Sequence, residues 1–381
     1  MSIRTHALSL PAAALAAALM APAAHAADFK AGEWDLSVGG IVNAYYTGVS
    51  CSGDQGITGL ALASEALGCG GKKHKTTIGN GLLPNALTVG AKTRQEGLDI
   101  AATLMIGAAV SSSDSISNNN NVDVRQGFVT VGNAEVGQFK FGRDYGMFGA
   151  SSILGDMTLL GAGAPVNATQ ANRVTLGHIG AGYSYLGTYG QLAYSSPNLG
   201  GLTLSAALLS PVDAFANAAY TAGNSPQFQL QATYALSGGK LWATAKSQSF
   251  DGAPGFTMKG FELGGSFSVG GLGLLANVQT GTGLGVLADG DNGDQKQNAV
   301  LVQGTYQVSP KLKLGLSLGS TRLKGAAGAA LQSNTNATLG SYYALTKSVT
   351  LVGELSQTTS KSAAGAKATM DGVALGGIVF F

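Results

Sequence analysis

Lys311 to Gly319 reads KLKLGLSLG, with leucine at every second position and lysine, glycine or serine between the leucines. A period of two is that of a β-strand whose two faces differ in chemistry. The same alternation recurs from Gln227 to Leu236 and from Gly260 to Val269, where apolar side chains oppose glutamine, threonine, serine or glutamate. These segments predict a sheet with one apolar face and one polar face.

The connections decide between a soluble sandwich and a membrane barrel, because alternation alone fits both. Every second connection is short, as at Gly270-Gly271 and Ser309-Pro310, whereas the intervening ones are longer and polar, as at 111–123 and 284–296. Short turns at one end and long loops at the other are typical of outer-membrane barrels, and a Greek-key sandwich would not keep this order. We therefore predict an all-β fold: a transmembrane antiparallel up-and-down barrel of 16 strands, at 34–47, 86–95, 98–110, 124–132, 138–143, 188–196, 201–210, 227–236, 240–250, 259–269, 272–281, 297–308, 311–322, 335–345, 348–358 and 369–381.

The composition is unusual for an exported soluble protein. Charged residues make up 11% of the chain, against about 25% in soluble domains. Arg4, the apolar run after it and Ala24-His25-Ala26 predict a cleaved signal peptide over 1–26, which leaves one barrel domain over 27–381. Removal of Arg4 lowers the net charge from +2 to +1, which argues against nucleic acid as a partner. No later apolar run is long enough for a membrane helix, so a closed barrel in the outer membrane is the expected location.

One segment lacks the strand pattern. After the short strand at 138–143, about 44 residues follow without helical or strand periodicity, and a loop of that length is usually functional. We expect residues 144–187 to form the third long loop, to fold into the barrel lumen and to constrict it.

The chain contains two cysteines, Cys51 and Cys69, both in the first long loop. In an exported protein they are expected to form a disulfide. A metal site is the weaker alternative, since only His74 lies near them in the sequence.

Enzyme chemistry has little support in the sequence. After the signal peptide only His74 and His178 remain, and neither stands in a nucleophile–base motif. The Asp-rich segment 288–295 lacks the spacing of an EF-hand, so calcium binding by the loop 284–296 stays open. We expect no enzymatic activity and no cofactor.

The segment FGRDYG at 141–146, preceded by VRQGFVTVG at 124–132, resembles the general diffusion porins of Gram-negative outer membranes. The resemblance covers the whole mature chain in architecture and residues 124–202 in motif. It implies sixteen-stranded trimeric barrels whose third loop folds inside, and passive diffusion of small hydrophilic solutes and ions. It also implies partners: outer-membrane lipid and the barrel assembly machinery, for which the terminal Phe381 would be the signal.

The resemblance implies particular pore residues as well. Arg125 matches a basic wall position and Asp156 an acidic position on the loop, while a second loop acid of the family falls on Leu160. A basic position of the first strand falls near Gly40, and a further wall arginine aligns with Arg173 or with Gly187. The expected constriction residues are Arg125, Lys140, Arg143, Asp156 and Arg173.

Charge on the polar face gives the expected selectivity. Seven cations against three acids are placed in the lumen, which predicts a weak preference for anions. The cations are Lys92, Arg94, Arg125, Lys140, Lys246, Lys311 and Lys313, and the acids are Asp99, Glu262 and Glu354. The alternatives are a substrate-selective channel, for which Tyr183, Tyr185 and Tyr189 are candidates, or a non-conducting barrel enzyme or adhesin.

Overall fold

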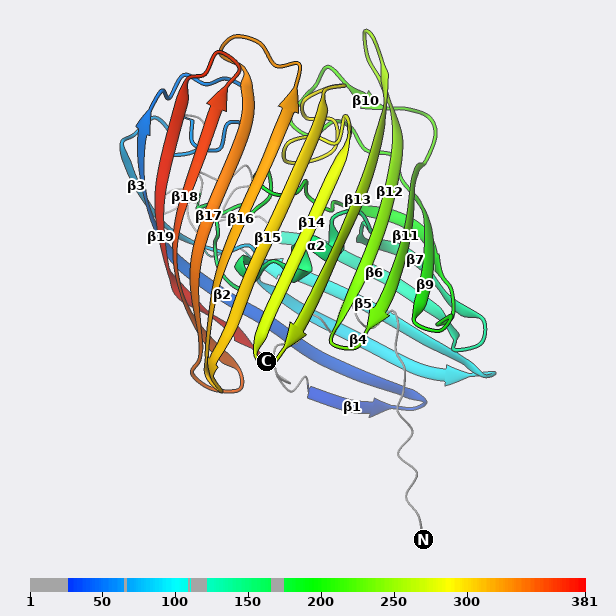
Figure 1. The fold of residues 1–381 in the computed structure, drawn as a ribbon. Helices are drawn as coiled ribbons and strands as arrows, with labels where there is room; N and C mark the ends of the chain where they lie inside the picture. Colours follow the sequence, from blue (N-terminus) through cyan, green and yellow to red (C-terminus); the bar gives the residue numbers. More distant parts are fainter. Residues whose placement is uncertain (1–26, 65–66, 109, 111–121, 166–174) are drawn as a thin grey trace.

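The computed structural model describes residues 27–64, 67–108, 110, 122–165 and 175–381. The predicted signal peptide and Arg173 therefore lie outside the described residues. One antiparallel sheet closes on itself, because β2 (Trp34–Gly53) pairs with β4 (Ala86–Gln95) along one edge and with β19 (Lys367–Phe380) along the other (Figure 1). At the seam, Gly40 and Phe381 exchange two backbone hydrogen bonds of 2.7 and 3.0 Å.

The described chain forms nineteen strands, of which sixteen positions make up the barrel wall. β1 (Ala27–Ala31) and β10 (Thr221–Ala222) are short additions, while β3 (His74–Gly79) and β4 pair with successive parts of β2 and share one wall position. The other wall strands are β5 (Leu98–Ala108), β6 (Val122–Asn133), β7 (Gly137–Tyr145), β8 (Thr188–Ser195), β9 (Leu202–Leu209), β11 (Gln227–Leu236), β12 (Gly239–Asp251), β13 (Phe256–Val269), β14 (Leu272–Thr282), β15 (Lys296–Ser309), β16 (Leu312–Lys324), β17 (Leu331–Ala344) and β18 (Val349–Ser362).

The predicted barrel and its number of strands are confirmed. β11 has the predicted bounds, whereas β2 extends six residues beyond the predicted end at residue 47. β3 was not predicted, because its sequence HKTTIG contains one large apolar residue and so carries no alternation.

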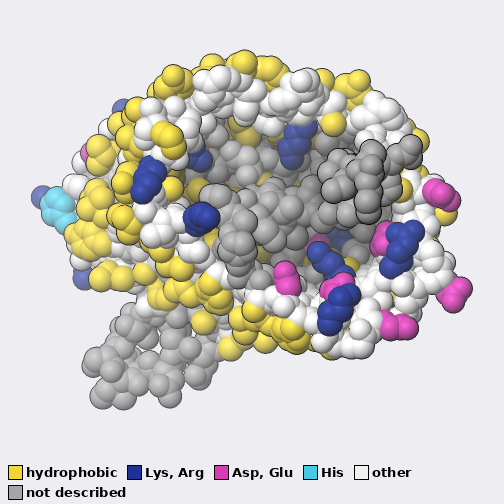
Figure 2. Space-filling model, turned by 90° about the horizontal axis from the view of Figure 1, so that it is seen from below, with side chains coloured by type: hydrophobic (Ala, Val, Ile, Leu, Met, Phe, Trp, Pro, Cys, Tyr) yellow, Lys and Arg dark blue, Asp and Glu magenta, His cyan; other side chains and the backbone are white. Residues whose placement is uncertain are grey.

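The two faces of the wall follow the alternation. On β16, Leu314, Leu316 and Leu318 are 41–51% exposed, whereas Ser317 between them is fully buried. On β13, Leu263 is exposed and Glu262 is buried. Seen from the end with the short turns, apolar side chains gather along much of the outer circumference (Figure 2). The apolar face is therefore outside, and the polar face lines the interior.

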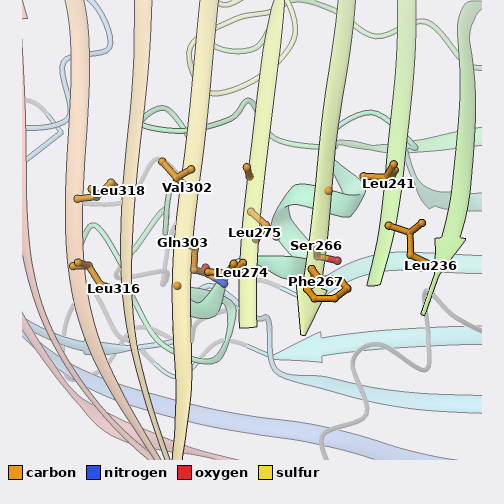
Figure 3. Close-up of a pocket in the computed structure, with 13 residues that line it drawn as sticks. Leu236, Leu241, Ser266, Phe267, Leu274, Leu275, Val302, Gln303, Leu316 and Leu318 are labelled. Atoms are coloured by element: carbon orange, nitrogen blue, oxygen red, sulfur yellow. The ribbon is translucent and has the colours of Figure 1, made fainter. Parts of the chain in front are cut away.

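The outer face contains a shallow apolar groove of about 550 Å³ (Figure 3). Gly265, Ala276 and Gly304 form its floor, because these outward positions carry small side chains on three neighbouring strands. Its lining is mostly apolar, as expected for a surface in contact with lipid, and Ser266 and Gln303 are the polar side chains in it. The larger residues around it are Leu236, Leu241, Phe267, Leu274, Val302, Leu316 and Leu318.

The first long loop is tied to the barrel by a disulfide. Cys51 near the end of β2 is bonded to Cys69, with the two Cα atoms 6.1 Å apart. Ile57 and Leu62 of this loop are buried in an apolar cluster that also contains Leu287 from the loop after β14. Several long loops thus pack together at one end of the barrel.

Inward-facing glycines make room for the loops. A Cβ atom on Gly319 of β16 would lie 1.9 Å from the carbonyl oxygen of Ala181, in the loop between β7 and β8. A Cβ on Gly304 of β15, which faces outward, would meet only a Leu274 methyl group at 3.8 Å. Glycine is therefore needed at position 319 because the loop lies so close there, and not because the strand itself requires it.

We expect Gly319→Val to displace the loop and to destabilise the protein by about 1–3 kcal/mol, the usual result of overpacking. Gly304→Val, the matched control, should be neutral because valine favours strands and the outer face has space. Denaturant unfolding in detergent and limited proteolysis of the loop check this. Equal protease resistance of the two variants would contradict the inferred close contact.

Candidate functional site

The loop between β7 and β8 is the candidate site. Its described part contains α2 (Ala150–Gly155) and a 3₁₀ turn, η1 (Met157–Leu160), and it lies within the ring of wall strands (Figure 1). Its backbone is hydrogen-bonded to buried side chains from the inner face of the wall.

Two wall carboxylates bind backbone N–H groups of the loop. Glu354 on β18 accepts hydrogen bonds from the N–H groups of Ala162 and Gly163 at 2.8 and 2.7 Å. Glu262 on β13 accepts from the N–H of Gly149 and the hydroxyl of Ser152, both at 3.0 Å. Both carboxylates are buried, so they hold the loop and present little charge to water.

Wall glutamines complete the attachment. Gln303 on β15 accepts from the Met157 N–H and donates to the Gly155 carbonyl, at 2.6 and 3.0 Å. Gln229 accepts from the Phe148 N–H at 3.0 Å, and Gln279 accepts from the Ser184 N–H at 2.8 Å. Buried backbone groups need such partners, because each unpaired one costs about 1–3 kcal/mol.

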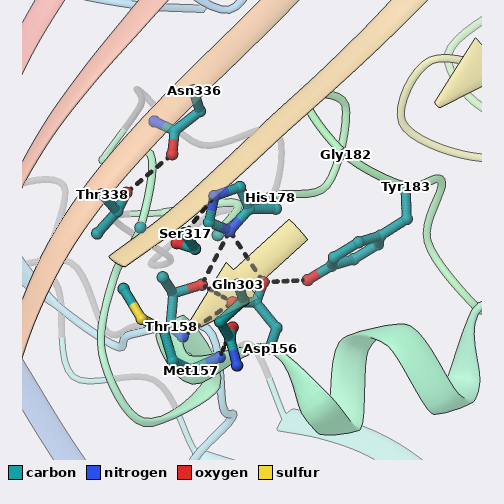
Figure 4. Close-up of polar contacts among 12 residues, drawn as sticks. Asp156, Met157, Thr158, His178, Gly182, Tyr183, Gln303, Ser317, Asn336 and Thr338 are labelled. Atoms are coloured by element: carbon teal, nitrogen blue, oxygen red, sulfur yellow. Dashed lines mark hydrogen bonds and ion pairs between the residues drawn. The ribbon is translucent and has the colours of Figure 1, made fainter. Parts of the chain in front are cut away.

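Asp156 forms the centre of a buried polar cluster (Figure 4). Its Oδ2 lies 3.1 Å from Nδ1 of His178 and accepts a 2.7 Å hydrogen bond from the Tyr183 hydroxyl. Its Oδ1 accepts from the N–H and the hydroxyl of Thr158 at 2.9 and 2.8 Å. Nε2 of His178 in turn lies 3.3 Å from the Ser317 hydroxyl on β16. The cluster therefore ties three parts of the loop to each other and to the wall.

The environment of Asp156 favours its ionised form. Burial alone raises the pKa of this carboxyl, but the charge and hydrogen bond of His178, together with the hydrogen bonds from Tyr183 and Thr158, outweigh burial and lower the pKa below its ordinary value. The order Ser317–His178–Asp156 resembles a catalytic triad. All three side chains are fully buried, however, so this arrangement offers no substrate access to the Ser317 hydroxyl.

Arg125 and Lys140, two of the expected constriction residues, face the interior in ion pairs. Arg125 contacts Asp123 through both Nε and a terminal nitrogen, at 2.7 and 2.6 Å, and donates to the Tyr185 hydroxyl at 2.9 Å. Lys140 pairs with Asp144 at 2.6 Å. Each cation is therefore accompanied by an acid from its own strand, which the expected charge count did not include.

Arg143 was placed incorrectly by the sequence analysis. It pairs in register with Gly127 and Gly190, on the same face as Phe141, which is 45% exposed on the outside of the barrel. Its guanidinium donates to the Val124 carbonyl and is exposed. Alternation along β7 requires this, because residues 139, 141 and 143 share one face.

Other expected lumen cations also have acidic partners. Lys246 on β12 is buried against Asp289 of the loop after β14, and Arg94 pairs with Asp99 at a short turn. Within the described residues, Lys92 and Lys313 have no salt-bridge partner. The ammonium group of Lys313 lies 5.2 Å from the ring centre of Tyr342.

Lys313 lines a cavity of about 540 Å³ on the side of the loop that faces the short turns. Lys311 is on the same lining, and Asp156 is the one acid there among the described residues, with its carboxylate held in the buried cluster. The remaining wall is formed by glutamine, serine, threonine and apolar side chains. We call this cavity the vestibule; its exposed side chains carry a net positive charge.

Two acids of the Asp-rich loop, Asp289 and Asp291, bind groups of the protein itself, whereas Asp294 is exposed. Asp289 accepts from Tyr189 at 2.8 Å as well as from Lys246, and Asp291 accepts from the N–H groups of Val286 and Leu287, both at 2.7 Å. Burial raises the pKa of Asp291 to about 7. Within the described residues, no group of three His, Cys, Asp or Glu side chains has the arrangement of a metal site.

The amino-acid sequence matches a family model described as Gram-negative porin over residues 12–363. The chain belongs to the Gram-negative porin family. A search of curated proteins finds no match. No helix among the described residues is long and apolar enough to cross a membrane.

Solved structures have the same fold as this porin. The outer membrane channel DcaP of Acinetobacter baumannii is 17% identical, with 93% of this chain and 100% of that chain covered and a TM-score of 0.69. An anion-selective porin from Comamonas acidovorans is 16% identical, with 92% and 100% covered and a TM-score of 0.66. Salmonella typhi OmpF, in complex with daunomycin, is 14% identical, with 92% and 100% covered and a TM-score of 0.60.

Asp156→Asn should loosen the loop. Loss of the charge in a buried pair costs about 3 kcal/mol, although the amide keeps the shape of the side chain. Because the pKa of Asp156 is lowered in the folded protein, its contribution is present above its unfolded pKa and is lost as the pH falls through the lowered value. Denaturant unfolding of both proteins from pH 7 to pH 2 measures this. Parallel stability curves would show that Asp156 does not supply the pH-dependent stability.

Proposed function

We propose that this porin forms a water-filled channel for passive diffusion of small hydrophilic solutes and ions, with a weak preference for anions. Its family and its fold support an outer-membrane channel. The observation that carries the anion preference is the positively charged vestibule, where Lys311 and Lys313 stand without an exposed acid among its described residues. Low-dielectric walls focus such a field on ions that pass.

The other inward charges contribute less to the proposed anion preference, because they are paired or covered. Arg125, Lys140 and Lys246 are accompanied by acids, and Glu262 and Glu354 are covered by the loop. The charge that has no nearby acid among the described residues is then that of Lys311 and Lys313 in the vestibule and that of Lys92. Among similar structures, the porin from Comamonas acidovorans is anion-selective, which is consistent with this reading.

The loop at 144–187 is proposed as the constriction. Arg125 and Lys140, each in an ion pair, and the buried Asp156 would then lie at the constriction. Arg173 is a further candidate, outside the described residues. Signal-peptide cleavage after residue 26, assembly through Phe381 by the barrel assembly machinery and a homotrimer belong to the same proposal. Trimeric forms among similar outer-membrane proteins are consistent with the trimer.

A substrate-selective channel is less well supported. Tyr183 and Tyr189 direct their hydroxyls to Asp156 and Asp289 and are buried, so they pack the loop and do not line a path. Tyr185 contacts Arg125. An enzyme that used the Ser317–His178–Asp156 arrangement would need access to Ser317, which is buried.

Lys313→Gln should move the reversal potential in a salt gradient towards cations, because it removes a vestibule charge that has no described ion-pair partner. The effect should fade as salt rises, since the screening length is about 10 Å at 0.1 M salt. Lys259→Gln is the matched control, because Lys259 faces outward on β13. A shift of equal size in both variants would reject the vestibule as the source of selectivity.

Shortening the loop between Gly155 and Gly163 should raise the single-channel conductance if this segment, which is bonded to Gln303 and Glu354 on the inner face of the wall, narrows the lumen as proposed. Planar-bilayer recording measures it, and heat-modifiability on gels verifies that the barrel is assembled. Unchanged conductance in an assembled variant would place the constriction elsewhere in the lumen.

A further inference from the structure

The vestibule is apolar where the loop lines it. Leu154 of α2 and Met157, Leu159 and Leu160 of η1 form this part of the lining, and Leu275 of β14 continues it on the wall. Leu159 and Leu275 are buried members of the main apolar cluster, and Leu154 and Leu160 pack against that cluster. Leu154 and Leu160 are themselves only half-buried. The surface is therefore the edge of a packed core that stays partly open to the cavity.

The cationic part of the lining comes from β16 and from the short turn before it. Lys311 and Lys313 are two residues apart, which is about 6.6 Å along a strand. Their ammonium groups stand on flexible four-carbon stems, so both can converge on one small anion. Neither forms an ion pair or a side-chain hydrogen bond with a described residue, and the ammonium group of Lys313 has only the Tyr342 ring beside it, 5.2 Å away. Their N–H donors are therefore available to a solute.

Neutral donors complete the polar part of the lining. Ser266 and Ser268 on β13 and Thr305 on β15 line the vestibule, and their hydroxyls form no hydrogen bond with the described residues. Gly273 on β14 lies between Ser268 and Thr305 in register, and a Cβ there would lie 2.6 Å from the Thr305 hydroxyl oxygen. The glycine thus leaves that hydroxyl unobstructed. A hydroxyl can donate to an anion as readily as to water.

The size and the polarity of the vestibule indicate the class of solute. Its volume of about 540 Å³ lies within the range of about 300–1,000 Å³ for small-molecule sites, which are mostly apolar with a few polar groups. The one acid of the described lining, Asp156, has its carboxylate in the buried cluster. A second charge on the same solute would have to face leucine and methionine side chains, where an unpaired charge is unfavourable. One negative charge on an apolar body therefore fits best.

We propose that the vestibule binds organic monoanions in which one carboxylate is joined to an apolar ring system. The carboxylate accepts from the ammonium groups of Lys311 and Lys313, and the rings lie on the apolar surface that begins at Leu154. Such a site deepens the proposed channel function and, as a step in transport, rests on it, because it names the class of anion that the channel retains. A small inorganic anion would meet the same cations but would gain nothing from the apolar surface.

The test measures binding by equilibrium dialysis of the full-length porin in nanodiscs of neutral lipid, with empty nanodiscs as the reference. The probes are naphthalene-2-carboxylate, its neutral carboxamide, naphthalene-2,6-dicarboxylate and, by competition, acetate. We expect the monocarboxylate to bind at least tenfold more tightly than the carboxamide and than acetate, and at least threefold more tightly than the dicarboxylate. Its advantage over the carboxamide should shrink as salt rises. Equal affinity for the monocarboxylate and the carboxamide, or tighter binding of acetate or of the dicarboxylate, would overturn the proposal.

Variants locate the site. Lys311→Gln/Lys313→Gln should weaken binding of the monocarboxylate at least fivefold, whereas Lys311→Arg/Lys313→Arg should keep it. Leu154→Ser should weaken the monocarboxylate and the carboxamide alike, because it removes apolar surface and no charge. The matched control is Lys92→Gln, which removes an inward cation that does not line the vestibule and should bind as the wild type does. Wild-type affinity in both the glutamine double variant and Leu154→Ser would overturn the proposal.

A separate measurement distinguishes this site from the proposed channel function. The reversal potential in a potassium chloride gradient reports the anion preference without any aromatic solute. An anion-selective channel that binds the monocarboxylate no better than the carboxamide would overturn the site alone. A porin that binds the monocarboxylate selectively but shows no anion preference would reject the proposed ion selectivity and leave the binding site in place.

Discussion

The structure depends on one constraint: a long loop enclosed by a barrel must find hydrogen-bond partners for its backbone. The wall supplies them through Glu262, Glu354 and a set of glutamines, each at an inward position of a different strand. A carboxylate can accept several N–H donors at once, which makes it a strong clamp in a site that water does not reach. The inner face is therefore polar for two reasons, to line an aqueous path and to hold the loop.

This double use changes how charge in the lumen should be counted. A formal count weighs Glu354 and Lys313 equally, although the first is buried under the loop and the second lines the vestibule. Arg125 with Asp123, and Lys140 with Asp144, are close pairs whose fields largely cancel a few ångströms away. An ion that passes would then respond mainly to the cations without a nearby acid.

The fold could be predicted because alternation and loop length are local properties of the sequence. The face of Arg143 could have been predicted as well: Phe139, Phe141 and Arg143 alternate, and resemblance to a motif outweighed that pattern. Other features had no local signal. The pairing of Lys246 with Asp289 requires the loop after β14 to return into the barrel. The cluster around Asp156 joins residues up to 161 positions apart, because His178 contacts both Asp156 and Ser317.

Alternation also explains why one sequence can serve two environments without conflict. On β16 the inward positions, from Lys313 through Ser317 to Thr321, meet the vestibule and the loop, while the outward positions run from leucine to Arg322 and Lys324. Because the two faces share no side chain, outward charges such as Arg322 and Lys324 act on the field inside the pore only through the barrel wall. Alternate residues of a membrane-barrel strand are thus constrained by two different environments, the lumen on one face and the membrane side on the other.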